Sequence, residues 1–461
     1  MIKTLSWVIL ITAFLAGTSA WAQDLCPVGK ASNKLVCLIP GIFGVNGLQL
    51  NTGSHQGHFE DSFVGTLRPL DSAIASQSSV LPLASPSSGI TFTWNPSAKV
   101  FTPSTESFGP VLGERAETIG RYKLSLGVAY QFFKFSTVDG TKMTGLPVVF
   151  THQDDSDDVF GRTCSVTGDN TTQCGFVRDV IKTNTAVDLK IHQYTTYVTF
   201  GLTNKIDVSM AIPIENARMG VSTTATIVNN SQQNLHTFVP RSDCAAPCFN
   251  GSFSKFRTAS GIGDITLRVK GTAWSSERSA LALGVDMRVP SGDELNFLGS
   301  GALGLKPIVV WSYRSRISPH ALVGFEMNRG SVLAGDISTG VKTKLPGQLT
   351  YSLGADAWLT NRVTVAVDLI GQQIFEAPRE TLATFTELGA CTTSACTSFA
   401  APKTDSNLDQ AFGSYNISNG SIGVKLKPFE NFLVTGNALV KLNNGGLRAR
   451  VVPLLAFSYT F

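Results

Sequence analysis

The stretch VVPLLAFSYTF, residues 451–461, indicates the fold class because its side chains alternate with a period of two. One set is apolar and consists of Val451, Pro453, Leu455, Phe457, Tyr459 and Phe461. The opposite set includes the polar residues Ser458 and Thr460. A period of two is that of a β-strand, and aromatic residues at one end of the apolar face are typical of a membrane interface. The stretch therefore predicts a membrane-spanning strand.

The same alternation recurs upstream. Within residues 361–371, for example, Val365 and Val367 alternate with Ala366 and Asp368. A soluble β-sandwich would also alternate, so the pattern alone leaves both architectures open. We expect twelve strands, at about residues 120–136, 185–201, 204–228, 263–273, 278–289, 303–314, 317–328, 347–359, 361–374, 414–427, 430–442 and 447–461.

The connections between these strands separate the two architectures, because short and long ones alternate. The short connections are LTNK, WSSER, RSR, LTN and PFEN, with NNGG (443–446) short on the other side. The long connections are about 137–184, 229–262, 290–302, 329–346 and 375–413. Outer-membrane barrels have short periplasmic turns and longer outer loops. The sequence therefore predicts an all-β, transmembrane, antiparallel up-and-down β-barrel of about twelve strands.

The composition agrees with this fold class. Charged residues form 15% of the 461-residue chain, below the roughly one quarter usual for soluble domains. After the first two dozen residues, no apolar run reaches the roughly 20 residues that a membrane-spanning helix needs. The formal net charge of +4 falls to +3 when Lys3 is removed with the leader, which is too little to indicate a nucleic-acid partner.

The chain divides into three parts. Residues 1–22 have a basic residue, a short apolar core and the small-x-small sequence Ala20-Trp21-Ala22, so we expect a signal peptide. Residues 23–118 lack barrel-like alternation, and we expect a plug in the lumen or a periplasmic segment, with a hairpin around Asn95-Pro96. Residues 119–461 are the predicted barrel. The expected location is the bacterial outer membrane, reached by export through the periplasm.

The eight cysteines fall into pairs that are close in sequence. An even number in an exported chain indicates disulfides, and none has the surroundings of a zinc site. The predicted pairs are Cys26/Cys37, Cys164/Cys174, Cys244/Cys248 and Cys391/Cys396. Because the last three pairs lie in long connections, we expect them to brace extracellular loops.

Charged residues collect on the face that should point inward. A Lys or Arg on the lipid face costs about 2–4 kcal/mol at mid-depth, so regular parity indicates the lumen. These residues either form an ion network that fills the barrel or line a polar path that sets selectivity. The candidates are Lys123, Lys190, Asp207, Asp264, Arg268, Lys270, Asp286, Arg288, Lys306, Glu326, Asp356, Asp368 and Lys425.

The predicted strand at 185–201 changes phase along its length. Leu189 and Ile191 have one parity, whereas Val198 and Phe200 have the other. A β-bulge near residues 193–196 would place all four on the same face. We therefore expect a bulge there.

The sequence offers little support for an enzyme. None of its histidines belongs to an HExxH motif, and no GxSxG element supplies a nucleophile. The acidic run HQDDSDD (152–158) lacks the glycine and the closing glutamate of an EF-hand loop. We therefore predict no catalytic residues, no metal site and no cofactor.

Two resemblances add to this interpretation. The ending FSYTF, with Phe457, Tyr459 and Phe461, resembles the carboxy-terminal signature that the barrel-assembly machinery recognises in bacterial outer-membrane barrels. Residues 261–314, with GIGD, VPSGD and GSG, resemble the MetA-pathway of phenol degradation family of transporter barrels, and residues 362–371 fit the same pattern.

The second resemblance implies an outer-membrane channel for small, aromatic or hydrophobic molecules. The expected partners are outer-membrane lipid, the assembly machinery and a small solute. The alternative is a structural or surface-binding barrel that does not transport and whose extracellular loops are braced by disulfides. A twelve-strand lumen lies between the filled eight-strand barrel and the open 16–18-strand porin, so we expect a plugged or gated passage.

Overall fold

The computed structural model describes residues 32–51, 107–152, 176–337 and 339–461, with positions 59, 70, 73, 74, 77, 92–95 and 100–103 between them. The predicted signal peptide, Cys26, Cys164 and Cys174 lie outside the described residues. Among the described helices, none has the length and apolar character to cross a membrane.

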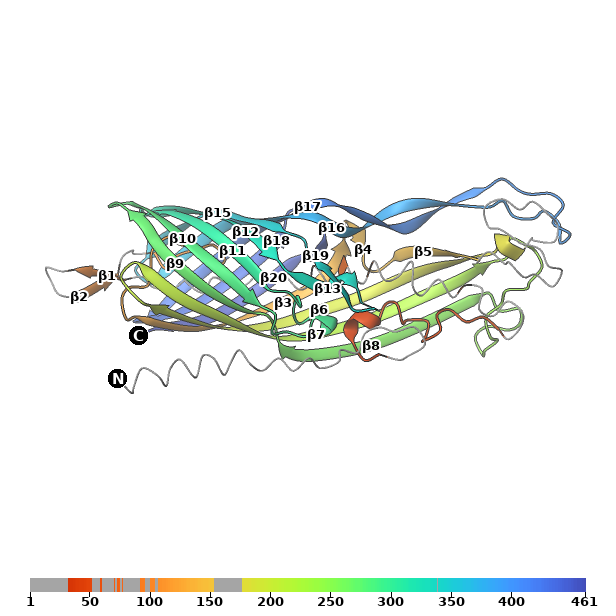
Figure 1. The fold of residues 1–461 in the computed structure, drawn as a ribbon, viewed down its shortest axis with the longest axis horizontal. Coiled ribbons are helices and arrows are strands. Elements are labelled where there is room, and N and C mark those ends of the chain that lie inside the picture. The colour runs from red at the N-terminus through yellow and green to blue at the C-terminus, as the bar shows by residue number, and fades with distance from the viewer. Residues whose placement is uncertain are drawn as a thin grey trace.

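Twelve antiparallel strands form a closed barrel, as the alternation predicts. The barrel strands are β3 (Leu124–Val138), β6 (Val180–Gly201), β7 (Ile206–Val228), β9 (Ile265–Ser275), β10 (Ser279–Val289), β11 (Gly304–Tyr313), β12 (Ile317–Asn328), β15 (Gln348–Thr360), β16 (Val363–Glu387), β17 (Lys403–Phe429), β18 (Phe432–Lys441) and β20 (Val451–Thr460). The ring closes because β3 pairs with β20 on one side and with β6 on the other. Figure 1 shows this barrel with the carboxy terminus at the end that carries the short turns.

Several long connections contain more strand than the sequence indicates. β8 (Asn250–Ile262) pairs with the carboxy-terminal part of β7, and β5 (Leu146–Thr151) pairs with β6. β16 and β17 remain paired up to the partners Glu387 and Lys403. The expected loops at 229–262 and 375–413 are therefore partly wrong, because their strands continue the sheet beyond the barrel wall as an extension, on the right in Figure 1.

The smaller elements lie around this frame. Their bounds are η1 (Leu35–Cys37), β1 (Phe92–Asn95), β2 (Val100–Pro103), β4 (Thr141–Lys142), η4 (Glu294–Asn296), β13 (Gly330–Asp336), β14 (Val341–Lys344) and β19 (Leu447–Ala449). β1 and β2 pair with each other as a separate hairpin, which confirms the hairpin expected around Asn95-Pro96. Figure 1 shows this hairpin beyond the short-turn end of the barrel.

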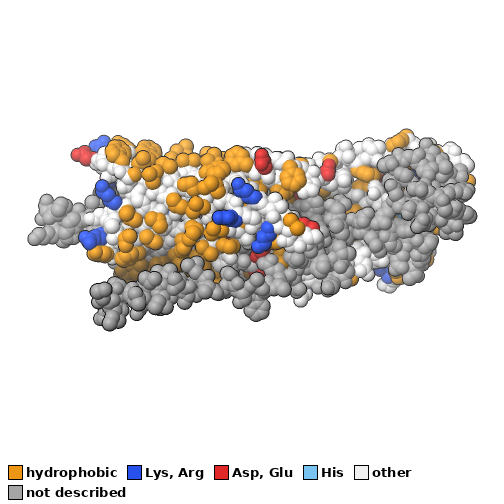
Figure 2. Space-filling model, in the orientation of Figure 1, with side chains coloured by type: hydrophobic (Ala, Val, Ile, Leu, Met, Phe, Trp, Pro, Cys, Tyr) orange, Lys and Arg blue, Asp and Glu red, His pale blue; other side chains and the backbone are white. Residues whose placement is uncertain are grey.

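The outer face of the barrel is an apolar belt. On β16, Val367 is 54% exposed whereas its neighbour Asp368 is 2% exposed. On β20 the exposed residues are Val451, Pro453, Leu455, Phe457 and Tyr459. Figure 2 shows hydrophobic side chains over the half of the visible face that corresponds to the barrel. Only a closed barrel can expose such a face to lipid with its strand backbone fully paired, so this is an outer-membrane β-barrel.

The predicted bulge in β6 is wrong. β6 pairs with β7 along its whole length, and with β3 from Lys190 to Phe200, without a register shift. Leu189 and Ile191 point inward and are fully buried, whereas Phe200, nearer the short-turn end, points outward and is exposed. The apolar residues of β6 change parity because different faces of the strand meet apolar surroundings along its length. Within the extension the inner face is apolar, whereas at membrane depth the outer face contacts lipid.

The disulfides are local where the structure describes them. Cys244 bonds to Cys248 with 5.4 Å between Cα atoms, and Cys391 bonds to Cys396 with 4.7 Å. Both pairs lie outside the named strands in long connections, as the spacing predicts. Cys37 is also disulfide-bonded.

Candidate functional site

The residues Ser107–Ile119 form an irregular segment inside the barrel, which we call the lumen segment. Its backbone belongs to no sheet; Gly109 supplies a left-handed turn with a φ of +81°. The lumen segment contacts Thr364 of β16 at one point and Asp207 of β7 at another. Because β7 and β16 lie on opposite sides of the ring, the segment crosses the lumen.

The first part of the lumen segment is held by a buried lysine. Lys425 of β17 donates hydrogen bonds from Nζ to the carbonyl oxygens of Phe108, at 3.0 Å, and Pro110, at 2.6 Å. The Phe108 amide donates to Thr364 Oγ1 at 3.1 Å. An irregular backbone cannot pair with itself, so wall side chains supply the partners that its polar groups need.

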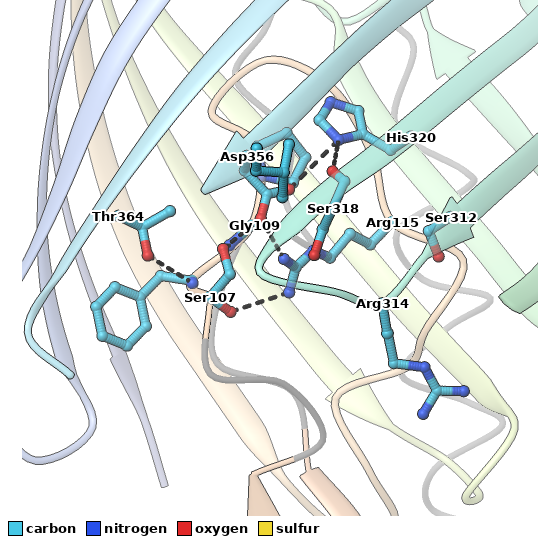
Figure 3. Close-up of polar contacts among 12 residues, drawn as sticks. Ser107, Gly109, Arg115, Ser312, Arg314, Ser318, His320, Asp356 and Thr364 are labelled. Atoms are coloured by element: carbon cyan, nitrogen blue, oxygen red, sulfur yellow. Dashed lines mark hydrogen bonds and ion pairs between the residues drawn. The ribbon is translucent and has the colours of Figure 1, made fainter. Parts of the chain in front are cut away.

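Two charged residues anchor the middle of the lumen segment. Glu114 accepts a hydrogen bond from Lys270 Nζ at 2.8 Å and also pairs with Arg268, both on β9. Arg115 donates to Asp356 Oδ2 of β15 at 2.6 Å and to the Ser107 carbonyl at 3.0 Å. Figure 3 shows Arg115 reaching from the lumen segment toward Asp356 on the wall. Each segment charge thus has an opposite charge on the wall.

The last part of the lumen segment is bound through its backbone. Lys270 Nζ also donates to the carbonyl oxygens of Arg115 and Glu117, at 2.7 and 3.0 Å. The Ile119 amide donates to Asp207 Oδ2 at 2.9 Å. The inward charges therefore do more than neutralise one another, because they bind the segment that fills this part of the lumen.

A histidine between two carboxylates lies beside the lumen segment. His320 of β12 has Nε2 at 2.6 Å from Asp368 Oδ1 and Nδ1 at 3.3 Å from Asp356 Oδ1. A Cβ atom on Gly113 would lie 3.0 Å from both Asp368 Oδ1 and His320 Nε2. Glycine therefore allows the segment to approach this cluster closely.

A second group of inward charges lies toward the long connections. Arg268 pairs with Asp286 at 2.6 Å, and Lys306 pairs with Asp286 at 3.4 Å. Arg288 pairs with Glu326 at 3.0 Å. The charges link β9, β10, β11 and β12 across the inner wall as alternating cations and anions.

Asp264 binds backbone amides in addition to a charged side chain. It accepts hydrogen bonds from the backbone amides of Gly292, at 3.2 Å, and Ser300, at 2.8 Å. It therefore fixes the connection between β10 and β11 over the inner wall.

The predicted lumen residues are placed as follows. The prediction that Lys190 faces the lumen is wrong. Because β6 has no bulge, Lys190 lies on the outer face of the strand, where it pairs with Asp188. Lys123 precedes β3 at the short-turn end and is partly buried. The structure places the rest on inward parity: Asp207, Asp264, Arg268, Lys270, Asp286, Arg288, Lys306, Glu326, Asp356, Asp368 and Lys425.

Sequence reasoning did not identify Ser107, Glu114 and Arg115 as partners of these wall residues. They lie in a stretch without periodicity, where pattern alone assigns no face. The available signal was the charge cluster GERAE, residues 113–117, within an otherwise weakly charged region. Across the described part of the chain, no group of His, Cys, Asp and Glu is arranged to hold a metal ion.

The interior of the extension differs from the barrel lumen because it is apolar. Leu189 and Ile191 of β6 and Met219 of β7 are fully buried there. Residues of the amino-terminal segment, including Leu35 and Ile39, belong to the same buried cluster. Lys34 Nζ pairs with Asp293 at 2.8 Å, and the Leu35 amide donates to Asn296 Oδ1 at 3.0 Å, which fixes η1 beside η4.

The chain is similar to one protein family and to several solved structures. The family model described as "Putative MetA-pathway of phenol degradation" matches residues 178–368, which confirms the predicted resemblance over that region. No curated protein matches the chain. Among solved structures, the chain is similar to an outer membrane channel from Pseudomonas putida F1, with 11% identity, 75% of this chain and 98% of that chain covered, and a TM-score of 0.41. It is also similar to a Pseudomonas aeruginosa FadL homologue, with 11% identity, coverages of 81% and 96%, and a TM-score of 0.30.

Proposed function

We propose that this outer-membrane barrel, which resembles the phenol-degradation family over residues 178–368, is a channel for small apolar or aromatic molecules. The observation that carries the proposal is the lumen segment, which is bound inside the barrel by wall side chains from opposite sides. A barrel with only a structural role can fill its lumen with its own side chains. A separate, polar-bound segment is suited to a passage that opens and closes.

The substrate class follows from the extension. Its inner face is apolar, with Leu189, Ile191 and Met219 buried against the amino-terminal segment. Transfer of an apolar solute from water into such an interior is favourable, by about 25 cal/mol per Å² of apolar surface removed from water. We therefore assign the extension to solute capture and the lumen segment to the gate.

Within this proposal, residues 23–118 have two roles rather than one. Residues 32–51 belong to the capture region, because they pack within the extension. The lumen segment is the plug. The inward charges of β9 and β17 hold that plug and, when it moves, line the polar part of the path.

Weakening both ends of the lumen segment is expected to increase flux. In the variant Lys270→Gln/Lys425→Gln, the bonds to four segment carbonyls and to Glu114 lose their charged donors. Hydrogen bonds to charged groups contribute about 1.5–3 kcal/mol each, so the closed position loses several kcal/mol. We expect uptake of a small uncharged phenol by proteoliposomes to rise about tenfold or more over the full-length protein.

The matched control is Lys205→Gln/Arg362→Gln, which removes the same charge from exposed short turns. It should leave uptake unchanged. If neither the full-length protein nor the lysine variant admits phenol faster than protein-free vesicles, the chain is instead a barrel that does not transport, with disulfide-braced loops.

A further inference from the structure

Three basic side chains form a row on the outer face of three adjacent strands. The strand register pairs Lys134 of β3 with Lys190 of β6, and Lys190 with Arg218 of β7. Their sequence neighbours Phe133, Ile191 and Ala217 are at most 2% exposed, so the cations have the outward parity. Like charges directly opposite each other on one sheet face are destabilising. The row, here called the cation row, is therefore a place where an anion would be stabilising.

The cation row lies at the outer boundary of the apolar belt. Lys134 is 10 positions after Leu124, Lys190 is 11 before Gly201, and Arg218 is 12 after Ile206. A tilted strand crosses the hydrocarbon core in about 9–11 residues. Counted from the short-turn end, each cation therefore lies where its strand leaves the hydrocarbon on the extracellular side.

Aromatic side chains lie on the membrane side of the cation row. Tyr130 and Tyr194 stand opposite each other on β3 and β6, with ring centroids 5.0 Å apart, and Tyr194 is 53% exposed. Exposed aromatic residues at this level are typical of the interfacial girdle of a membrane barrel. The cation row lies four residues farther along each of these two strands.

Neighbouring protein groups neutralise the row only in part. Asp188 Oδ2 is 2.6 Å from Lys190 Nζ, but its side chain is 57% exposed. Arg218 Nε donates to the neutral Asn216 Oδ1 at 2.8 Å. Among the described neighbours, one exposed carboxylate against three cations leaves a net positive outer surface at the membrane boundary.

We propose that the cation row binds the phosphate groups of a phosphorylated lipid headgroup in the outer leaflet. Arginine presents a planar fork that matches phosphate oxygens, and lysine supplies a point charge. On β3, the outer face toward the short-turn end bears the apolar residues Val128 and Leu126, six and eight residues from Lys134, which are 51% and 38% exposed. A ligand with phosphates on the cation row and acyl chains on the apolar surface contacts both features, whereas free phosphate contacts the cation row alone. The proposal does not depend on whether the barrel transports a solute.

The experiment measures binding of detergent-solubilised full-length protein to vesicles of phosphatidylethanolamine containing bisphosphorylated lipid A. The test variant is Lys134→Gln/Lys190→Gln/Arg218→Gln. Each Lys or Arg near an anionic leaflet contributes about 1 kcal/mol, so the triple variant should lose on the order of 100-fold in affinity at low salt. The wild-type affinity should also fall as salt rises. The matched control is Lys205→Gln/Arg278→Gln/Arg362→Gln, with three exposed turn cations removed at the opposite end, and should bind as the wild type does.

Further arms separate the alternatives. Vesicles with dephosphorylated lipid A should reduce wild-type binding to that of the triple variant. The charge-retaining variant Lys134→Arg/Lys190→Arg should keep full affinity, which tests the row even if the neutral variant folds poorly. Equal binding of both lipid A forms would overturn the proposal. Stabilisation by inorganic phosphate alone, as large as that by the vesicles, would also overturn it, because the site would then take free anions rather than lipid.

Discussion

A chain that lacks residues 23–119 should assemble as a barrel and conduct ions at least about ten times better than the full-length protein. The part of this stretch that the structure describes contributes no barrel strand, since β3 begins at Leu124 and β1 and β2 pair with each other. Without the lumen segment, wall charges such as Lys270 and Lys425 face water instead of the segment backbone. A twelve-strand lumen is intermediate between filled and open barrels, so removing its filling should open an aqueous path.

The matched control is a chain that lacks residues 23–106 and keeps the lumen segment. It loses the apolar contacts of Leu35 and its neighbours, so lower stability of the extension is expected. Its conductance in planar bilayers should nevertheless stay near that of the full-length protein. If the two truncated chains conduct equally, the lumen segment is not the closing element.

The barrel was predictable because the alternation of inward and outward residues can be recognised within each strand separately. Inward and outward residues alternate on β16 and β20 as the sequence indicates, and a lipid face excludes charge strongly enough to show in each strand. The strand limits agree within a few residues at most short turns, for example at β12 (Ile317–Asn328).

The placement of Lys190 and the lumen segment could not be predicted in this way. The side chains of Lys190's strand face different surroundings along its length. For Lys190, the alternation predicted the strand but not what surrounds its two faces. The inside of the barrel becomes apolar in the extension, so an outward lysine there lies beyond the hydrocarbon of the membrane. The lumen segment was hidden for another reason. Its partners Asp356, Lys270 and Lys425 are more than a hundred residues away in sequence, and no periodicity links them to Glu114 and Arg115.

Replacing Val367 by Arg should cost about 2–4 kcal/mol of barrel stability and sharply reduce the amount assembled. Val367 is 54% exposed on the outer face and lies four residues into β16, near the middle of the roughly ten residues that cross the core. An arginine there must lie in hydrocarbon or draw water into it. The measurement is urea-induced unfolding in lipid vesicles, with heat-modifiable mobility on gels as the readout of the folded fraction.

Two substitutions in the same strand calibrate this effect. Val367→Leu keeps the lipid-facing side chain apolar and should retain wild-type assembly. Asp368→Asn changes the adjacent, inward side chain, which contacts His320 at 2.6 Å, so it should alter the lumen cluster yet still insert. Because the two positions share depth and backbone, only the medium that each side chain meets differs. Normal assembly of Val367→Arg together with failure of Asp368→Asn to insert would mean that the faces of β16 are assigned the wrong way round.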